Sequence, residues 1–460
     1  MAVITVEDII DATGGQLLTE NSKFFDGVSI DTRTISEGDL FFAIRGVNFD
    51  GYEFLEEALL KGRGAVVESR PAALPKDKVI IYVSDTLRSL QDLAHFLRKK
   101  HDIPVVAVTG SNGKTTTKEM IYAIVSRKFK TLKNEGNLNN HIGLPLSLTR
   151  LQSDEEIIVL EMGMNSSGEI RRLCEIAVPS HGVITNIGKA HLGRLGSYEA
   201  VRDAKLEILE GLSVAIINSD DADLTHGVEN IKEFSGQIIT FAINNSADIT
   251  ARDLRTTKIG SDFLLDIKGM ESMSVSLGVF GHFNVYNALA AAAVSFSLGM
   301  NMNEIKAGLE SYTAFPMRFE ILKAKEVTLI NDSYNANPSS VEESIKELFR
   351  LGDKGRRVAV IGDMYELDEF SETAHRDVGK LACKAGLDVF VAVGEMMGLA
   401  ADEIINLKGG TAGPEVFRFN DANEAKGNIM DILQQGDTVL IKGSRGMAME
   451  RIVERITDAI

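Results

Sequence analysis

The chain has 460 residues, of which 44% are hydrophobic and 25% charged, a composition typical of globular rather than disordered or fibrous proteins. At about 100–200 residues per domain, this length predicts two to four domains. The net charge of −17 argues against nucleic acid and anionic membranes as partners, because like charges repel.

The first 84 residues alternate between short helical and strand patterns. Residues 3–12 and 54–61 are predicted to form helices. Residues 38–44 are predicted to form a turn followed by a strand, and residues 64–67 a second strand. We therefore expect a small N-terminal α/β domain over residues 1–84.

Residues 85–315 have the pattern of a doubly wound α/β sheet. A helix is expected at 87–100, and an Ala-rich helix at 285–298. Apolar runs typical of buried parallel strands lie at residues 105–108, 157–160, 183–187 and 214–218. Between 236 and 279 the pattern alternates, which we interpret as an antiparallel extension of the sheet.

A third unit is expected over residues 316–460. Its predicted strands are residues 327–331, 358–361, 389–393 and 439–441. The prediction is thus an α/β protein of three domains: the small N-terminal domain, a central doubly wound phosphate-loop ATPase domain and a C-terminal Rossmann-like domain.

Residues 109–116, Thr-Gly-Ser-Asn-Gly-Lys-Thr-Thr, form the sharpest motif. The order strand, glycine turn, Lys-Thr and helix is the context of a phosphate-binding loop, in which backbone N–H groups and the helix dipole attract the anion. Lys114 would supply charge to the β- and γ-phosphates, and the Thr115 hydroxyl can bind Mg²⁺. The residues expected to bind ATP here are Gly110, Ser111, Asn112, Gly113, Lys114, Thr115 and Thr116.

Polar side chains follow the neighbouring strands, where functional residues of open α/β sheets gather. Glu161 follows the strand 157–160, Asn186 ends the strand 183–187, and His191 lies in the loop beyond it. Glu161 and Thr115 could hold Mg²⁺, which prefers oxygen ligands. By spacing alone, His191 is more typical of a surface or packing residue, and Lys205, in the helical stretch 203–208, of a solvated lysine.

The two cysteines, Cys174 and Cys383, are far apart and flanked by apolar residues. We expect both to be buried small hydrophobes in a reducing cytoplasm, with no disulfide framework. The N-terminus has no signal-peptide pattern, and no run of about 18 apolar residues predicts membrane insertion.

Together, these residues resemble the Mur ligase family over nearly the whole chain. The segments that carry the resemblance are residues 110–120, 136–146, 161–165, 185–192, 281–288, 331–338, 362–367 and 442–445, with His375. Their ordered series is specific, although any one of them could arise by chance.

The resemblance implies a ligase that uses ATP and Mg²⁺ to join D-alanyl-D-alanine to a UDP-N-acetylmuramoyl tripeptide through an acyl phosphate. The three domains would bind the UDP-sugar, ATP and the acceptor dipeptide. An Asp-Asn-Pro-Arg motif, typical of the diaminopimelate-adding member, is absent, which favours the dipeptide-adding activity. We expect a monomer.

The resemblance also assigns residues. Lys114, Glu161, His191 and Lys205 would be catalytic. Mg²⁺ would be bound by Thr115, Glu161, His191 and Lys205, the last as a carbamate. Further nucleotide contacts would come from Asn284, Asn287, Arg318 and Asp332. The UDP substrate would be bound by Ser29, Asp31, Arg33, Asn137 and Asn139.

Three alternatives stay open at this point: a folylpolyglutamate-type ligase, a small-molecule kinase with the same loop, and a nucleotide-binding module without activity. The unit Asp31-Thr32-Arg33 argues against the first. Phosphate release that depends on an amine acceptor would exclude the second. The third is disfavoured by the presence of Lys114, Thr115, Glu161 and His191.

Overall fold

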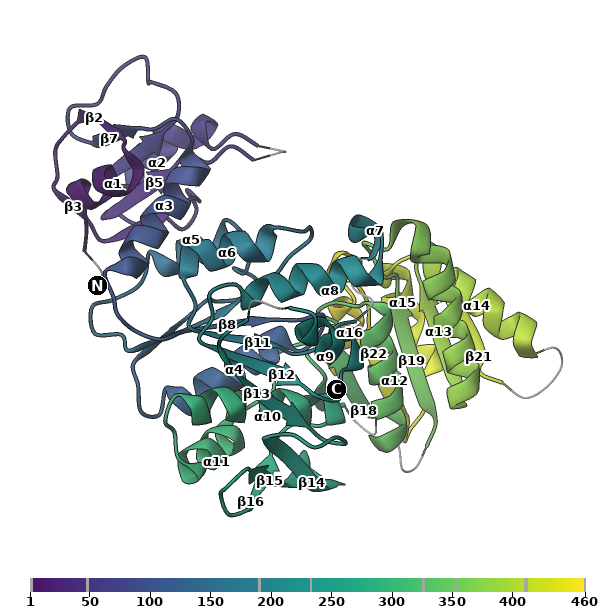
Figure 1. The fold of residues 1–460 in the computed structure, drawn as a ribbon. Helices are drawn as coiled ribbons and strands as arrows, with labels where there is room; N and C mark the ends of the chain where they lie inside the picture. Colours follow the sequence, from purple (N-terminus) through teal and green to yellow (C-terminus); the bar gives the residue numbers. More distant parts are fainter. Residues whose placement is uncertain are drawn as a thin grey trace.

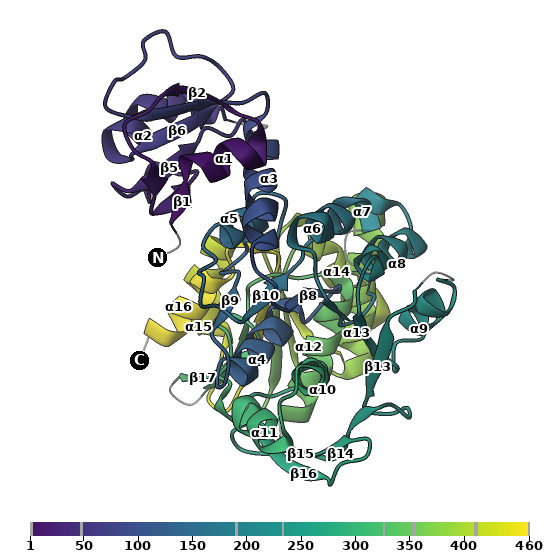
Figure 2. The ribbon, with the colours of Figure 1, turned by 60° about the vertical axis from the view of Figure 1, so that its left-hand side comes forward.

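The computed structural model describes residues 3–46, 49–188, 192–231, 234–324, 327–351, 355–408 and 413–458. It contains three α/β units in chain order, each built around its own sheet (Figure 1). The N-terminal unit stands apart, whereas the central and C-terminal units lie side by side in both views (Figure 2). The predicted three-domain α/β fold is confirmed, while the boundaries at residues 84 and 315 stay predictions.

The N-terminal sheet has the order β2-β7-β6-β5-β4. These strands are β2 (Gln16–Thr19), β4 (Gly27–Ser29), β5 (Asp39–Phe42), β6 (Gly64–Val67) and β7 (Val79–Tyr82), accompanied by the short pair β1 (Ile4–Thr5) and β3 (Phe24–Phe25). The helices are α1 (Val6–Thr13), η1 (Gly51–Phe54) and α2 (Leu55–Lys61). Helix α1 begins after Thr5, later than predicted, because Thr5 and Asp8 form a capping box.

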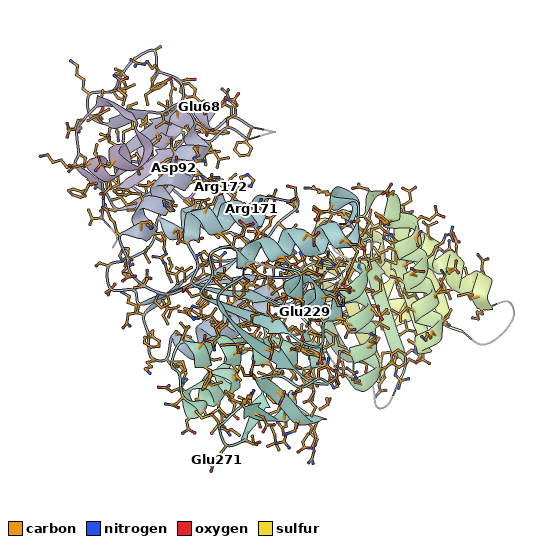
Figure 3. The ribbon with its side chains drawn as sticks, viewed as in Figure 1. Glu68, Asp92, Arg171, Arg172, Glu229 and Glu271 are labelled. Carbon is orange, nitrogen blue, oxygen red and sulfur yellow. The ribbon has the colours of Figure 1, made fainter. Side chains whose placement is uncertain are left out.

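Helix α3 (Thr86–Lys99) joins the N-terminal and central units. Leu90 and Leu93 belong to the N-terminal core, whereas Ala94 packs into the central one. Arg172 reinforces the junction by donating to the Gln91 Oε1 atom from helix α6 (Glu169–Ala177), and Arg172 lies near Asp92 in Figure 3.

The central sheet has nine strands in the order β16-β15-β14-β13-β12-β11-β8-β10-β9. They are β8 (Val105–Thr109), β9 (Thr131–Lys133), β10 (Ile157–Glu161), β11 (His181–Ile184), β12 (Val214–Asn218), β13 (Gln237–Ala242), β14 (Ile249–Thr256), β15 (Ser261–Ile267) and β16 (Met273–Leu277). Strand β8, which leads into the phosphate loop, lies between β10 and β11 and is parallel to both.

Two strand predictions in this sheet were wrong in detail. Strand β13 is parallel to β12, and β14 is parallel to β13, so the antiparallel extension begins only with β15. The alternating pattern reports that one face of a strand is buried and does not determine strand direction. Strand β11 ends at Ile184 and not at 187, because Thr185 and Asn186 turn to hold the phosphate loop.

Helices cover both faces of the central sheet (Figure 2). On one face lie α4 (Lys114–Val125), α10 (His282–Ser297) and α11 (Met302–Ser311), and on the other α5 (Gly143–Leu148), α6 and α8 (Tyr198–Leu206). The remaining short helices are α7 (Leu192–Leu195), η2 (Glu207–Leu209) and α9 (Ala222–Glu229). Helix α10 begins three residues before its predicted start, directly after Gly281.

The C-terminal sheet has the order β17-β18-β22-β19-β20-β21 and is parallel except for β17. Its strands are β17 (Glu320–Ala324), β18 (Val327–Asp332), β19 (Arg357–Gly362), β20 (Val389–Val393), β21 (Glu415–Phe419) and β22 (Thr438–Lys442). Its helices are α12 (Pro338–Leu351), η3 (Asp368–Phe370), α13 (Ser371–Ala385), α14 (Glu395–Lys408), α15 (Ala422–Ile432), η4 (Arg445–Met447) and α16 (Glu450–Asp458).

Cys174 is buried as predicted, whereas Cys383 is only half-buried and packs against the C-terminal core. Burial raises the pKa of the Cys174 thiol to about 12, which keeps it protonated. Within the described part of the chain, no helix is long and apolar enough to cross a membrane.

Candidate active site

The phosphate loop runs from the end of β8 into α4, as the sequence predicted. Gly110 and Gly113 have φ values of 144° and 82°, which disfavour other residues. A Cβ atom on Gly110 would lie 1.9 Å from the Thr185 Oγ1 atom, and one on Gly113 would lie 2.3 Å from the Asn287 Oδ1 atom. Both glycines are therefore required by the backbone conformation and by close neighbours.

Lys114 folds back over this loop. Its Nζ atom donates hydrogen bonds to the carbonyl oxygens of Gly110 at 2.7 Å and Ser111 at 3.3 Å. Burial lowers the pKa of Lys114, while the nearby Glu161 carboxylate opposes the shift and Arg318 adds to it. The ammonium is thus held at the loop, where it would meet an anion bound by the backbone N–H groups.

The segment after β11 holds the loop in place. The Asn186 Oδ1 atom accepts from the Asn112 N–H at 3.0 Å, and Asn186 Nδ2 donates to the Asn112 carbonyl at 3.1 Å. Thr185 Oγ1 donates to the same carbonyl, and the Gly188 N–H donates to the Ser111 Oγ atom at 2.7 Å. Asn186 therefore fixes the position of the loop backbone at Asn112.

Glu161 is the centre of a buried polar cluster. The carboxylate is 3% exposed and accepts from Thr115 Oγ1 at 2.7 Å and from Asn139 Nδ2 at 2.7 Å. Arg318 reaches in from the C-terminal unit and donates to the Thr115 Oγ1 atom at 3.1 Å. The structure thus brings together four residues that the sequence placed in separate motifs.

This cluster fits Mg²⁺ in its chemistry. A hydroxyl and a carboxylate oxygen are hard ligands, and Mg²⁺ is typically bound through one or two carboxylates plus substrate phosphates. Among the described residues, no group of three or more His, Cys, Asp or Glu side chains forms a metal cage. The predicted ligand His191 lies outside the described residues.

Lys205 lies in α8 and is 1% exposed, so it is not a solvated helix lysine. Burial, and then the charge of Lys114, lowers its pKa well below the usual value. Among the described residues, no hydrogen bond or carboxylate offsets this shift. A buried lysine without a partner is costly, because desolvating an ammonium disfavours its charged form.

Arg318 is presented by a strained loop. Met317 and Phe319, on either side, have φ values of 61° and 54°, a left-handed conformation that is uncommon for such residues and frequent at functional sites. The guanidinium lies 3.9 Å from the centre of the Tyr334 ring. Tyr334 was not assigned from the sequence, because its partner is distant in the chain.

Asp332, predicted to contact the nucleotide, is fully engaged within the C-terminal unit. Its carboxylate accepts from the Phe319 N–H at 3.1 Å, from Ser344 Oγ at 2.7 Å and from Lys442 Nζ at 2.6 Å. These contacts fix the segment that carries Arg318.

The phosphate loop is bonded directly to the start of α12. Asn112 Nδ2 donates to Ser339 Oγ at 2.9 Å, and Asn337 Nδ2 donates to Asn112 Oδ1 at 2.9 Å. Ser339 Oγ in turn donates to Asn337 Oδ1 at 2.9 Å, which closes a ring of three hydrogen bonds. The central and C-terminal units therefore meet at the loop itself.

Asn284 and Asn287 lie buried on α10, behind the loop. Thr117 Oγ1 donates to Asn287 Oδ1 at 3.2 Å, and Asn287 Nδ2 donates to Asn284 Oδ1 at 3.1 Å. These hydrogen bonds fix the Asn287 side chain, against which Gly113 packs.

The residues predicted to bind UDP lie mostly elsewhere. Ser29 ends β4, and Asp31 and Arg33 follow it in the next turn, where Arg33 lowers the pKa of Asp31 to about 2 through paired hydrogen bonds. Asn137 is exposed, whereas Asn139 contacts Glu161. The N-terminal turn is not joined to the phosphate loop by any hydrogen bond or ion pair among the described residues.

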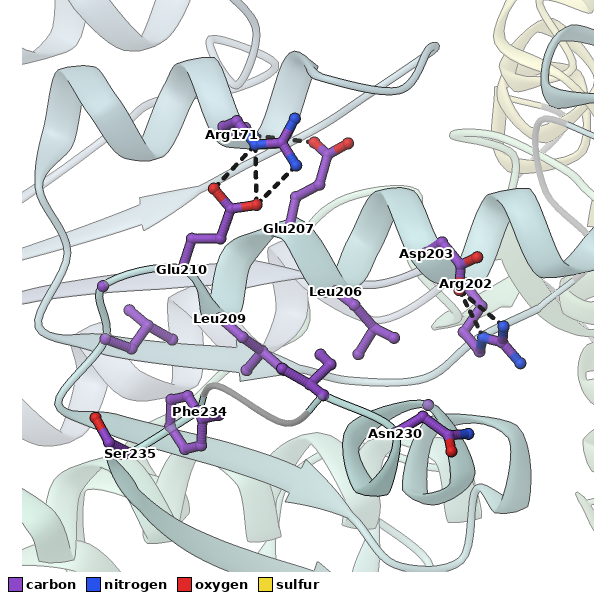
Figure 4. A pocket seen from close by; sticks show the side chains of 14 residues that line it. Arg171, Arg202, Asp203, Leu206, Glu207, Leu209, Glu210, Asn230, Phe234 and Ser235 are labelled. Atoms are coloured by element: carbon purple, nitrogen blue, oxygen red, sulfur yellow. Dashed lines mark hydrogen bonds and ion pairs between the residues drawn. The ribbon is translucent and has the colours of Figure 1, made fainter.

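Two cavities differ in their relation to this cluster. A cavity of about 280 Å³ is lined by the segments 335–337, 365–367 and 444–446, next to the ring at Asn112. A larger one, of about 870 Å³, lies behind α8 and is flanked by η2 and α9 (Figure 4). Arg171 and Glu210, which form an ion pair 2.7 Å apart, line this larger cavity together with apolar residues such as Leu206 and Phe234, and no residue of the phosphate loop lines it.

Comparisons with known proteins agree with this geometry. Three family descriptions match the chain: "Mur ligase family, catalytic domain" over residues 25–100, "Mur ligase middle domain" over 108–295, and "Mur ligase, glutamate ligase domain" over 317–445. The chain is similar to the UDP-N-acetylmuramoyl-tripeptide–D-alanyl-D-alanine ligases of Bacillus subtilis (34% identical, covering 99% of this chain and 98% of that one) and Escherichia coli (36%, covering 100% and 99%).

Solved structures give the same result. MurF from Acinetobacter baumannii is 31% identical, with a TM-score of 0.91 and coverage of 100% of this chain and 99% of that one. MurF ligase from Thermotoga maritima, solved in complex with ADP, is 29% identical, with a TM-score of 0.82 and coverage of 94% and 97%. A folylpolyglutamate synthase from Mycobacterium tuberculosis is 15% identical, which shows a shared fold alone.

Proposed function

The chain belongs to the Mur ligase family, and we propose that it is an ATP-dependent ligase that joins D-alanyl-D-alanine to a UDP-N-acetylmuramoyl tripeptide in peptidoglycan precursor synthesis. One observation carries the proposal beyond the resemblance: Lys114, Thr115 and Glu161 of the central unit meet Arg318 of the C-terminal unit at the phosphate loop. We further propose that the enzyme acts in the cytoplasm as a monomer.

The loop is suited to transfer of the terminal phosphate of ATP to a carboxylate. In the first step, a carboxylate oxygen of the tripeptide would bond to the γ-phosphorus as the bond to ADP breaks, which gives an acyl phosphate. In the second, the dipeptide amine would attack the acyl carbon, inorganic phosphate would leave, and the nitrogen would lose a proton. Lys114 and Arg318 would neutralise the charge on the transferring group.

Mg²⁺ bound with the phosphates would supply further charge neutralisation. We propose Thr115, Glu161, His191 and Lys205 as the residues that hold it, the last as a carbamate. The carbamate would form when the neutral amine of Lys205 adds to CO₂ and releases a proton. The burial of Lys205, and the absence of a carboxylate or hydrogen bond among the described residues that would offset its lowered pKa, support this assignment.

The nucleotide and UDP contacts remain proposals that follow the family resemblance. Asn284, Asn287, Arg318 and Asp332 would complete the ATP site around the loop. Ser29, Asp31 and Arg33 would bind the uridine diphosphate, and Asn137 and Asn139 the rest of that substrate. Closure of the N-terminal unit would then bring the tripeptide to the loop and exclude water from the acyl phosphate.

We place the acceptor dipeptide in the smaller cavity. It adjoins Asn337, which is bonded to the phosphate loop, and Arg445 is the cationic side chain among the described residues that line it. The dipeptide carries a free carboxylate, for which a guanidinium is a suitable partner.

Arg445→Ala is therefore expected to raise the KM for D-Ala-D-Ala about 10–100-fold, the scale of one hydrogen bond to a charged group. Arg451, an exposed arginine that donates to Asn423 Oδ1, provides the matched control. Steady-state kinetics with each substrate varied in turn would measure this. An unchanged KM for the dipeptide in Arg445→Ala would place the acceptor elsewhere.

The function itself is tested by phosphate release from ATP in the presence of the UDP-muramoyl tripeptide. Release is expected to depend on D-Ala-D-Ala and to match the amide product one for one. Turnover of the nucleotide without an amine would support the kinase alternative. Activity with folate and glutamate, but not with the muramoyl tripeptide, would support a folylpolyglutamate-type ligase.

A further inference from the structure

Strand β10, which carries Glu161, extends further than β9, its neighbour on one side. Strand β10 is paired with β9 in parallel from Ile157 with Thr131 to Val159 with Lys133, where β9 ends. β10 continues to Glu161, which pairs with Val108 of β8 on its other side. The backbone of Glu161 would thus lack a ladder partner on the β9 side.

The side chain of Asn134 fills this position. Its Oδ1 atom accepts from the Glu161 N–H at 2.9 Å, and its Nδ2 atom donates to the Glu161 carbonyl at 2.9 Å. Nδ2 also donates to the Leu138 carbonyl at 2.8 Å. A side-chain amide has the same donor and acceptor as a peptide group, so Asn134 supplies the two bonds of the missing rung.

Asn134 is in turn fixed to the helix that carries the phosphate-loop lysine. The Nζ atom of Lys118, on α4, donates to the Asn134 carbonyl at 2.6 Å and pairs with the Glu119 carboxylate at 3.0 Å. Lys118 is 0% exposed and Asn134 is 1% exposed. The connection from α4 to Glu161 is therefore dry and has defined geometry.

We propose that Asn134 is a positioning residue for the reaction: by holding the backbone of Glu161 at the point where β9 ends, it directs the carboxylate toward Thr115 and sets the affinity of the site for Mg²⁺. This inference rests on the metal role proposed above for Glu161. Asn134 touches neither substrate nor metal in this scheme, and it acts through Glu161 alone. Loss of its two bonds would let the end of β10 move and the carboxylate with it.

The test is the magnesium dependence of ATP binding, measured by calorimetry on the full chain. In Asn134→Ala, the Mg²⁺ concentration that gives half of the metal-dependent gain in ATP affinity is expected to rise about 10-fold or more, the usual scale for residues that orient a metal ligand. ATP binding measured in EDTA is expected to be the same as in the unmodified protein. The ligase rate should recover as Mg²⁺ is raised.

Asn301→Ala is the matched control. Asn301 caps α11 through a capping box, so its loss should lower the Tm without changing the magnesium dependence. If Asn134→Ala does not fold, Lys118→Met releases the Asn134 carbonyl while filling the same space, and it should shift the magnesium dependence in the same direction by a smaller factor.

A folded Asn134→Ala protein with an unchanged magnesium dependence would overturn the role of Asn134 and leave the proposed function intact. Failure of Mg²⁺ to increase ATP affinity in the unmodified protein is a different result: it would overturn the metal role of Glu161 and this inference with it.

Discussion

Replacing Lys114 by alanine is expected to lower the rate of amide formation about 10²–10³-fold, which corresponds to about 2.7–4 kcal/mol of lost transition-state stabilisation. The Lys114 ammonium is held over the loop by the carbonyls of Gly110 and Ser111, so it is already oriented before phosphate transfer begins. Its removal would also take away a positive charge that interacts with the buried Glu161 carboxylate. Both effects act on the step that transfers the γ-phosphate.

The measurement is kcat and KM for ATP at saturating tripeptide and dipeptide. A charge that acts mainly in the transition state should change kcat more than KM. Lys128→Ala is the control, because Lys128 lies just beyond the other end of α4 and its ammonium makes only long contacts. These are with the Gly299 carbonyl at 3.4 Å, with Glu304 at 3.9 Å and with the Phe129 ring, whose centre is 5.3 Å away. Near-normal turnover of Lys114→Ala would refute the assigned role.

The phosphate loop could be predicted from the sequence because its determinants are local. A buried strand, two glycines at fixed spacing and the Lys-Thr pair at the start of α4 lie within twelve residues, and each constrains the backbone directly. Helices α2, α3 and α4 were predicted for the same reason: their apolar periodicity is a property of one segment.

The cluster around Glu161 could be predicted only in part. Glu161 was found because functional residues follow parallel strands. Asn134, Tyr334 and Lys118 were missed, because their contacts join segments 16 to 27 residues apart in the chain. Arg318 and Thr115 were both assigned, but their contact, across 203 residues, was not predicted. The spacing of residues along the sequence does not predict that a side chain will complete a strand ladder or stack on a distant guanidinium.

For Asn186, the sequence predicted the location of the residue but not its role. It was singled out because it ends a predicted strand, without an assigned role. In the structure it lies at the phosphate loop and holds the backbone of Asn112 by two hydrogen bonds. The predicted direction of β13 was wrong because an alternating pattern reports one buried face of a strand and does not determine whether the strand runs parallel or antiparallel to its neighbours.

Replacing Lys205 by alanine is expected to lower turnover by at least about 10²-fold, the scale on which removing one group from a preorganised site acts. As an ammonium, Lys205 would place a second positive charge near Lys114 inside the protein, and the pKa of Lys205 is lowered for that reason as well as by burial. As a carbamate it would instead attract Lys114 and offer oxygen atoms to Mg²⁺. Short carboxylic acids such as acetate should partly restore Lys205→Ala, because they return an anion to the space.

Lys118 is an internal control in this test, because it is a buried lysine that we do not expect to be carbamylated. It is as buried as Lys205, but its ammonium has a carbonyl and a carboxylate as partners, so nothing favours its reaction with CO₂. Carbon-13 NMR of the protein in ¹³C-bicarbonate should therefore show one carbamate signal, which Lys205→Ala removes although Lys118 remains. Removal of CO₂ should lower the activity of the unmodified enzyme and leave that of acetate-treated Lys205→Ala unchanged. Full activity of Lys205→Ala without added acid would instead mean that the buried amine serves packing alone, and the metal would then depend on Thr115, Glu161 and the phosphates.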